Sequence, residues 1–288
     1  MHSPAELLVS WLRRQLPSPA FAWLEQTIGQ LREANSDRTL YLALASAARR
    51  LGKEGLTLQP ADIAEAETAR HGWRSQYWNI DTSARVLLLL AGNVSPERFA
   101  ARLDMVCKTA EVGELIAYYR GLPLYPNPVE LVTLAADGVR TNIADVFSAI
   151  AHHNPYPAEF FNDAQWNQMV LKALFIGAPL HPIERLDARA NPELARMLID
   201  YARERTAAHR TVSPELWRCV GPFLDPTTLG DVVPRLASDD IWERRAAALA
   251  LGDSPHPDAA ILLQTAPALI AELKTGTLSW DTFAPPLR

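Results

Sequence analysis

Apolar residues recur at helical spacing through nearly the whole chain, and this periodicity constrains the fold more than any other feature. Clear examples are Phe21, Leu24, Ile28 and Leu31, then Leu40, Leu44, Ala47 and Leu51, then Leu194, Met197, Leu198, Tyr201 and Ala202. Residues three and four positions apart share one face of an α-helix, so each set predicts an amphipathic helix. Sustained strand-like alternation of apolar and polar residues is absent. The sequence therefore predicts an all-α protein.

Five helix starts are marked by a capping residue followed by proline. The pairs are Ser3-Pro4, Ser95-Pro96, Asn127-Pro128, Asn191-Pro192 and Ser213-Pro214. The capping oxygen accepts a bond from the first turn, where the missing N–H of proline costs nothing. A glutamate follows each proline within two residues, where the positive end of the helix dipole favours it. The 22 prolines cluster between periodic segments, so we expect short helices joined by tight turns and no long coiled coil.

The architecture that these helices indicate is a set of irregular stacked hairpins. This could be an α-α superhelix of HEAT-like character or a right-angled bundle. The segment from Ile241 to Leu251 carries an arginine pair and then an alanine-rich face, as HEAT-type repeats do. No clean repeat period extends over the chain, so no repeat family is assigned. We expect one domain over residues 1–281 and a loosely ordered tail over residues 282–288.

Composition narrows the class of protein and its location. Hydrophobic residues make up 48% and charged residues 21% of the 288 positions, as expected for a folded globular chain. The net charge of -5 gives no general attraction to nucleic acid. The amino terminus lacks a secretory signal, and the longest apolar run, Val86 to Ala91, is far below the roughly 20 residues that cross a bilayer. We therefore expect a cytoplasmic protein that neither binds nucleic acid nor inserts directly into a membrane.

The familiar catalytic motifs are absent. Only Gly52 and Gly55 are spaced closely enough for a phosphate-binding loop, and no Lys-Ser or Lys-Thr follows them. There is no His-Glu-x-x-His, no Gly-x-Ser-x-Gly, and neither Cys107 nor Cys219 has a partner at zinc or redox spacing. We expect no metal and no cofactor. An enzyme whose acid and base come from distant helices stays open.

Polar groups are unusually dense among apolar ones between residues 152 and 192. Before them, residues 142–151 read as a helix with Asn142 at its cap and Asp145 in its first turn. His152, His153 and Asn154 then lead into Pro155-Tyr156-Pro157, whose prolines favour extended backbone at the preceding residues and predict a rigid loop. The two histidines either end the helix or, with a third ligand, bind a metal. Asn154 and Tyr156 are candidate ligand contacts.

The next predicted helix carries a core stripe, formed by Trp166, Met169, Val170, Ala173 and Leu174. Asn167 lies outside the polar stripe of this helix, so we expect it to be buried and hydrogen bonded. Its partner is either the backbone of the loop at Asn154 or a ligand. Lys172 is either solvated and ion-paired or a functional amine.

For several charged residues the sequence leaves the interaction partner open. Asp187 and Arg189 stand just before the helix that begins at Asn191-Pro192, and they form either a local salt bridge or part of a site. Arg85 precedes a strongly apolar run, so it needs a carboxylate or a ligand anion, and Asp145 and Asp187 are the first partners we expect. The aromatics between 71 and 79 either cover the core or, with Arg85, enclose a planar or anionic molecule.

Three runs of sequence resemble one known family. They are Asn154-Pro-Tyr-Pro-Ala-Glu159, Trp166-Asn-Gln-Met-Val-Leu-Lys-Ala-Leu-Phe175, and Leu186-Asp-x-Arg-x-Asn-Pro-Glu-Leu-Ala195. On these motifs the chain is similar to the EboA family of bacterial ebo gene clusters, and the likeness extends over most of its length. The resemblance implies a cytoplasmic, mostly helical protein linked to production or export of a secondary metabolite. The implied cluster partners resemble a prenyltransferase, a TatD-like metal hydrolase, a sugar isomerase-like barrel and a dehydroquinate synthase-like enzyme. No reaction is implied.

The leading hypothesis is an accessory, non-catalytic protein that binds a precursor metabolite or a partner enzyme of the ebo pathway. Its candidate ligand-binding residues are Arg85, Asp145, Asn154, Tyr156, Asn167, Lys172, Asp187, Arg189 and Asn191. The alternative is an enzyme acting on an anionic or prenylated small molecule. It would use Asp145, Lys172, Asp187 and Arg189, with one carboxylate as general base.

Overall fold

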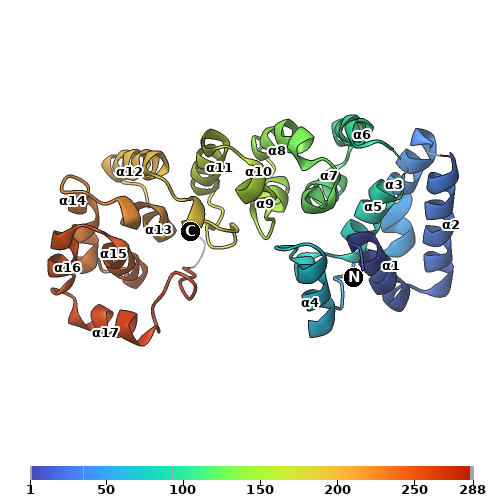
Figure 1. Ribbon diagram of the computed structural model, residues 1–288. Coiled ribbons are helices and arrows are strands. Elements are labelled where there is room, and N and C mark those ends of the chain that lie inside the picture. The colour runs from blue at the N-terminus through green and yellow to red at the C-terminus, as the bar shows by residue number, and fades with distance from the viewer. Residues whose placement is uncertain (1, 35, 93, 286–288) are drawn as a thin grey trace. The chain divides into compact units, whose positions relative to one another are not determined.

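The computed structural model describes residues 2–34, 36–92 and 94–285. Within these ranges the regular secondary structure is helical and no strand occurs; β-bridges are isolated, as between Gly55 and Asn79. The predicted all-α class is confirmed. The chain divides into two compact units, one up to Phe161 and one from Asn162 (Figure 1). The single domain expected over residues 1–281 stays a prediction.

In its described residues the first unit contains ten α-helices and three 3-10 turns. In chain order they are α1 (Pro4–Gln15), α2 (Ser18–Ala34), α3 (Asp37–Leu51), α4 (Pro60–Ala69), η1 (Ser75–Tyr77), α5 (Ile80–Ala91), α6 (Pro96–Thr109), α7 (Val112–Arg120), η2 (Leu122–Leu124), η3 (Pro128–Leu131), α8 (Val132–Val139), α9 (Ala144–Ala151) and α10 (Tyr156–Phe160).

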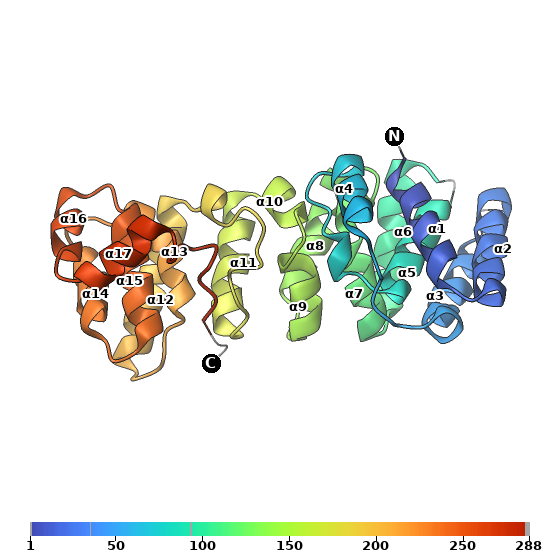
Figure 2. The ribbon, with the colours of Figure 1, turned by 90° about the horizontal axis from the view of Figure 1, so that it is seen from below.

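Packing in the first unit centres on α5, which contacts α1, α2, α3 and α7, while α7 also contacts α9. Figure 2 shows α3, α5, α7 and α9 side by side, and Figure 1 shows α6 and α8 along one side of this row. Almost every residue of α5 is buried, so this helix needs apolar side chains on all faces. The apolar run Val86 to Leu89 meets that need. The helices α3, α5, α7 and α9 thus form one row, and α6 and α8 cover one side of it, as in stacked helical hairpins.

The second unit is organised around α15. Its elements are α11 (Asp163–Phe175), η4 (Asp187–Arg189), α12 (Pro192–Ala207), η5 (Pro214–Leu216), α13 (Trp217–Val220), η6 (Gly221–Phe223), α14 (Leu229–Val232), η7 (Val233–Ala237), α15 (Ile241–Asp253), α16 (Pro257–Leu263) and α17 (Pro267–Thr275). Residues 246–251 of α15 are all buried, and this helix packs against α13, α16 and α17. Its alanines allow close approach: a Cβ added at Gly221 would lie 2.9 Å from the Ala250 Cα.

The predicted helix starts are correct at three of the five Ser-Pro and Asn-Pro pairs. Ser3, Ser95 and Asn191 cap α1, α6 and α12, each accepting a backbone N–H of the first turn. Asn127 and Ser213 instead precede the 3-10 turns η3 and η5 and make no capping bond.

The boundaries around residue 150 differ from the prediction. The predicted cap at Asn142 is wrong, because α9 begins at Ala144 with Ile143 as its N-cap. Tyr156 is not extended, since α10 starts there. The rigid loop shrinks to residues 152–155, where His153 takes a left-handed φ of 51°.

Within the described part of the expected tail, Phe283 is buried and packs edge-on against Trp242 and Trp280. Thr282 also exchanges hydrogen bonds with Ser279. Residues 286–288 of the expected tail lie outside the described residues.

Candidate functional site

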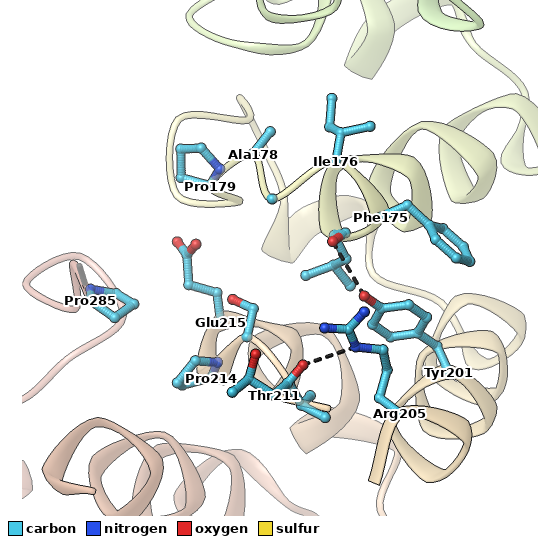
Figure 3. Close-up of a pocket in the computed structure, with 14 residues that line it drawn as sticks. Phe175, Ile176, Ala178, Pro179, Tyr201, Arg205, Thr211, Pro214, Glu215 and Pro285 are labelled. Carbon is cyan, nitrogen blue, oxygen red and sulfur yellow. Dashed lines mark hydrogen bonds between the residues drawn. The ribbon is translucent and has the colours of Figure 1, made fainter. Parts of the chain in front are cut away.

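A pocket of about 280 Å³ opens in the second unit, and we name it the α11–α12 pocket (Figure 3). Its walls are the end of α11 with the following turn (174–179), Tyr201 and Arg205 of α12, residues 211–215, and Pro285. All of these residues belong to one compact unit.

The apolar wall of this pocket follows from how α11 ends. Gly177 has a φ of 70°, and the Ala178 N–H donates to the Ala173 carbonyl at 2.8 Å, which closes the helix with a left-handed glycine. This turn leaves the Phe175 side chain 64% exposed at the pocket edge, with Ile176 beside it. The Phe175 ring meets the Tyr201 ring edge-on, at 5.0 Å between centroids. The Tyr201 ring thus supports an exposed aromatic side chain at the pocket edge.

Arg205 supplies the positive charge of the pocket. Its Nε donates to the Thr211 carbonyl at 2.9 Å, and its guanidinium lies 5.8 Å from the centre of the Tyr201 ring. The Tyr201 hydroxyl donates to the Leu174 carbonyl at 3.2 Å, so the ring beneath the guanidinium is itself held (Figure 3). Within the described ranges Arg205 makes no ion pair with a carboxylate, although five N–H donors are present on a guanidinium. Its charge can therefore serve a ligand.

Glu215 is the acidic group of the pocket, and its side chain has a structural role. It is 5% exposed and accepts the backbone N–H groups of Leu180 and His181 at 2.9 and 2.8 Å. The His181 Nδ1 lies 3.0 Å from the same carboxylate. These bonds tie the turn after α11 to η5 and so fix the shape of the pocket.

Four of the nine predicted site residues belong to the first unit. The Arg85 guanidinium is buried and pairs with Asp81 and Glu114, each at 2.7 Å, instead of the expected Asp145 and Asp187. A carboxylate on its own helix and another on α7 therefore satisfy its charge. Asp145 is exposed in the first turn of α9.

The loop residues Asn154 and Tyr156 are buried and engaged in backbone contacts. The Asn154 amide donates to the carbonyls of Tyr119 and Ala149, and its oxygen accepts the Tyr156 N–H. The Tyr156 hydroxyl donates to the Pro128 carbonyl at 2.5 Å. Both side chains thus join α7, α9 and η3.

Of the five predicted residues in the second unit, Asn167 and Asn191 are brought together. Their amides exchange two hydrogen bonds, at 3.2 and 2.8 Å, so the expected partner of Asn167 in the loop at Asn154 is wrong. Asn191 also caps α12 at Leu194 and donates to the Arg189 carbonyl. Asn191 can pair with Asn167 because one side chain can both cap a helix and satisfy a buried amide beside it.

The remaining three predicted residues do not meet as a cluster. Asp187 pairs with Arg218 through both carboxylate oxygens, at 2.5 and 2.7 Å, and not with Arg189. Arg189 lies over the Trp166 ring at 4.9 Å and bonds Asp163 at 3.1 Å. The expected local salt bridge between Asp187 and Arg189 is therefore wrong. Burial lowers the pKa of Lys172, which stands one turn before the end of α11.

Two important residues of the pocket escape the sequence analysis. Glu215 follows Ser213-Pro214 and so resembles an ordinary first-turn glutamate, although it is buried. Arg205 lies among exposed residues of α12 and gives no local signal. The one available signal in the sequence is the apolar pair Phe175-Ile176 directly before Gly177, at the end of a predicted helix.

The fold and the pocket define an all-helical protein with a small cavity that is partly apolar and partly charged. In the described part of the chain no group of three or more His, Cys, Asp and Glu side chains could hold a metal ion, and none of the helices is long and apolar enough to span a membrane. The model of the family described as metabolite traffic protein EboA matches residues 4–221, and the chain belongs to that family. No curated protein and no solved structure matches the chain.

Proposed function

We propose that this EboA family member binds, without catalysis, a small metabolite with an apolar body and one acidic group in the α11–α12 pocket. The supporting observation is the pairing of an exposed apolar wall at Phe175 with the Arg205 guanidinium, which makes no ion pair with a carboxylate of the described residues. The family description, metabolite traffic protein, fits a metabolite as partner. Enzymes of the ebo cluster, which the resemblance implies as protein partners, stay a prediction.

The size of the pocket limits the ligand. About 280 Å³ is near the lower end of the roughly 300–1,000 Å³ typical of small-molecule sites. The apolar body of the ligand would lie against Phe175, Ile176 and Pro179, and its acidic group would bind the Nη atoms of Arg205. The Glu215 carboxylate at the loop side of the pocket would repel a second acidic group (Figure 3). A monoacid is therefore the class that we propose.

A titration with 2-naphthoate and with the neutral 2-naphthalenemethanol tests this assignment, using ligand-observed NMR. A hydrogen bond to a charged group contributes roughly 1.5–3 kcal/mol, and partial exposure reduces this to about 1.4 kcal/mol, or about tenfold in Kd. Arg205→Gln should weaken naphthoate binding about tenfold and leave the alcohol within about twofold. Phe175→Ala should weaken both compounds, because both lose the same apolar contact.

The matched control is Arg196→Gln, which removes the same charge from an exposed position on α12 paired with Glu193 and Asp200. This variant should bind like the wild type. Equal weakening of naphthoate by Arg205→Gln and Arg196→Gln would show a general charge effect and contradict the proposal. So would saturable binding that Phe175→Ala leaves unchanged.

A further inference from the structure

A second, smaller cavity lies in the first unit, and we name it the Arg120 pocket. It measures about 130 Å³ and is lined by Tyr77, Trp78, Arg120, Ser148 and residues 152–154. These residues come from the end of η1 and the position after it, from the last position of α7, and from α9 with the loop that follows it. Three segments distant in sequence, 77–78, 120 and 148–154, thus place a guanidinium, a hydroxyl and two imidazoles around one space.

Arg120 is the cation of this pocket, and its charge is incompletely compensated. The guanidinium donates to the Tyr77 carbonyl, which fixes its position. Burial lowers the pKa of Arg120, and Asp145 offsets this only in part through space. Among the described residues no carboxylate forms an ion pair with Arg120. A partly buried guanidinium with only a carbonyl as close partner favours an incoming anion.

The walls around Arg120 are held in place before any ligand arrives. The His153 ring stacks on the Tyr77 ring at 3.5 Å and 10° between planes, with the His153 backbone in the left-handed region. Asn154 is fixed by its bonds to two carbonyls and to the Tyr156 N–H. Ser148 lies in the last turn of α9 and His152 is its C-cap, and the His152 N–H donates to the Ser148 carbonyl at 2.9 Å. Preorganised donors lower the cost of binding.

We propose that the Arg120 pocket binds a single small oxyanion, the phosphate or carboxylate group of a ligand. Arg120 supplies the charge, and the Ser148 hydroxyl supplies a further hydrogen bond. A volume of about 130 Å³ admits such a group but no large apolar body. A metal cation fits poorly, because the guanidinium would repel it and no metal-binding group of side chains is found in the described ranges. This inference is independent of the α11–α12 pocket, which other residues form.

Titration with inorganic phosphate and, separately, with acetate tests the inference, at constant ionic strength maintained with chloride. The side-chain NMR signals of His152 and His153 report binding. We expect saturable shifts with a Kd on the order of 1 mM for at least one anion. The anion with the lower Kd shows whether the pocket takes the phosphate or the carboxylate group of a ligand. Arg120→Gln should weaken it about tenfold, because a charged donor is lost.

Arg140→Gln is the matched control, since Arg140 is an exposed arginine of the same unit that pairs with Asp137. It should leave the Kd unchanged. Ser148→Ala keeps the Arg120 bond to Tyr77 and should weaken binding about threefold, so it tests the site even where Arg120→Gln disturbs the loop. Absence of saturable shifts with both anions would overturn the inference. Equal affinity in Arg120→Gln and Arg140→Gln would do the same.

Discussion

The amide pair Asn167–Asn191 decides whether the predicted site residues of the second unit hold the fold together or hold a ligand. The two hydrogen bonds of the pair measure 3.2 and 2.8 Å, and Asn167 is 3% exposed. Each bond contributes about 1 kcal/mol net, and a small cavity adds to the loss. Asn167→Ala should therefore lower the free energy of unfolding by about 2–3 kcal/mol.

Asn191→Ala should cost about 3 kcal/mol, because it removes the same two bonds and also the cap on the Leu194 N–H. Since both single variants lose the shared bonds, the double variant should be less damaging than their sum by about 1–2 kcal/mol. Urea unfolding followed by circular dichroism measures all four proteins. Gln168→Ala, an exposed neighbour on α11, should stay within about 0.5 kcal/mol of the wild type.

Additive single effects, within about 0.5 kcal/mol, would refute the reasoning, because they would mean that the two amides do not interact. A different outcome would restore the ligand role for Asn167. In that case Asn167→Ala would keep wild-type stability and lose 2-naphthoate binding.

Three further predictions concern stability. Arg85→Met should lower the free energy of unfolding by about 3–5 kcal/mol, because it leaves Asp81 and a second carboxylate without their cation; thermal melting measures this, and an unchanged Tm would contradict it. Hydrogen bonds from neighbouring threonines lower the pKa of Asp225 from 3.8 to about 2, so their stabilising effect is present above pH 3.8 and lost as pH falls through about 2; an ordinary pKa in an NMR titration would disprove this. Gly221→Ala should cost about 1–3 kcal/mol in urea unfolding, because its Cβ would lie 2.9 Å from the Ala250 backbone, and wild-type stability would show that α15 can move away.

The helices were predictable because apolar periodicity and capping residues are local signals. Asn191 illustrates this. Its side chain accepts the N–H of Leu194, three residues later, and a contact between residues so close in sequence can be predicted from the sequence alone. Glu215 illustrates the limit. The same Ser-Pro-Glu pattern ends as a 3-10 turn, because the carboxylate bonds Leu180 and His181 from a loop that precedes it by more than thirty residues. Tertiary contacts override the local signal there.

The candidate site was less predictable, because dense polar residues in a helical protein mostly satisfy one another. Asp187 pairs with Arg218, and Arg85 pairs with Glu114. Both partners are about thirty residues away in sequence, a distance over which periodicity carries no information. Arg205 has the opposite difficulty. Its sequence neighbours are typical of the solvent-exposed face of a helix. That face lines a pocket only because the turn after α11 lies against it.

The family match and the core together explain how the last helices bear on the α11–α12 pocket. The match ends at Gly221, and every residue that lines the pocket except Pro285 lies within it. Beyond the match, α15 packs against α13 and η5, the elements that directly follow and include Glu215. Because Glu215 holds the turn after α11, a shift of α15 would move the carboxylate and widen or close the pocket. We therefore expect α15, which α16 and α17 pack against, to influence the proposed site through packing, while the proposed ligand contacts lie within residues 174–215.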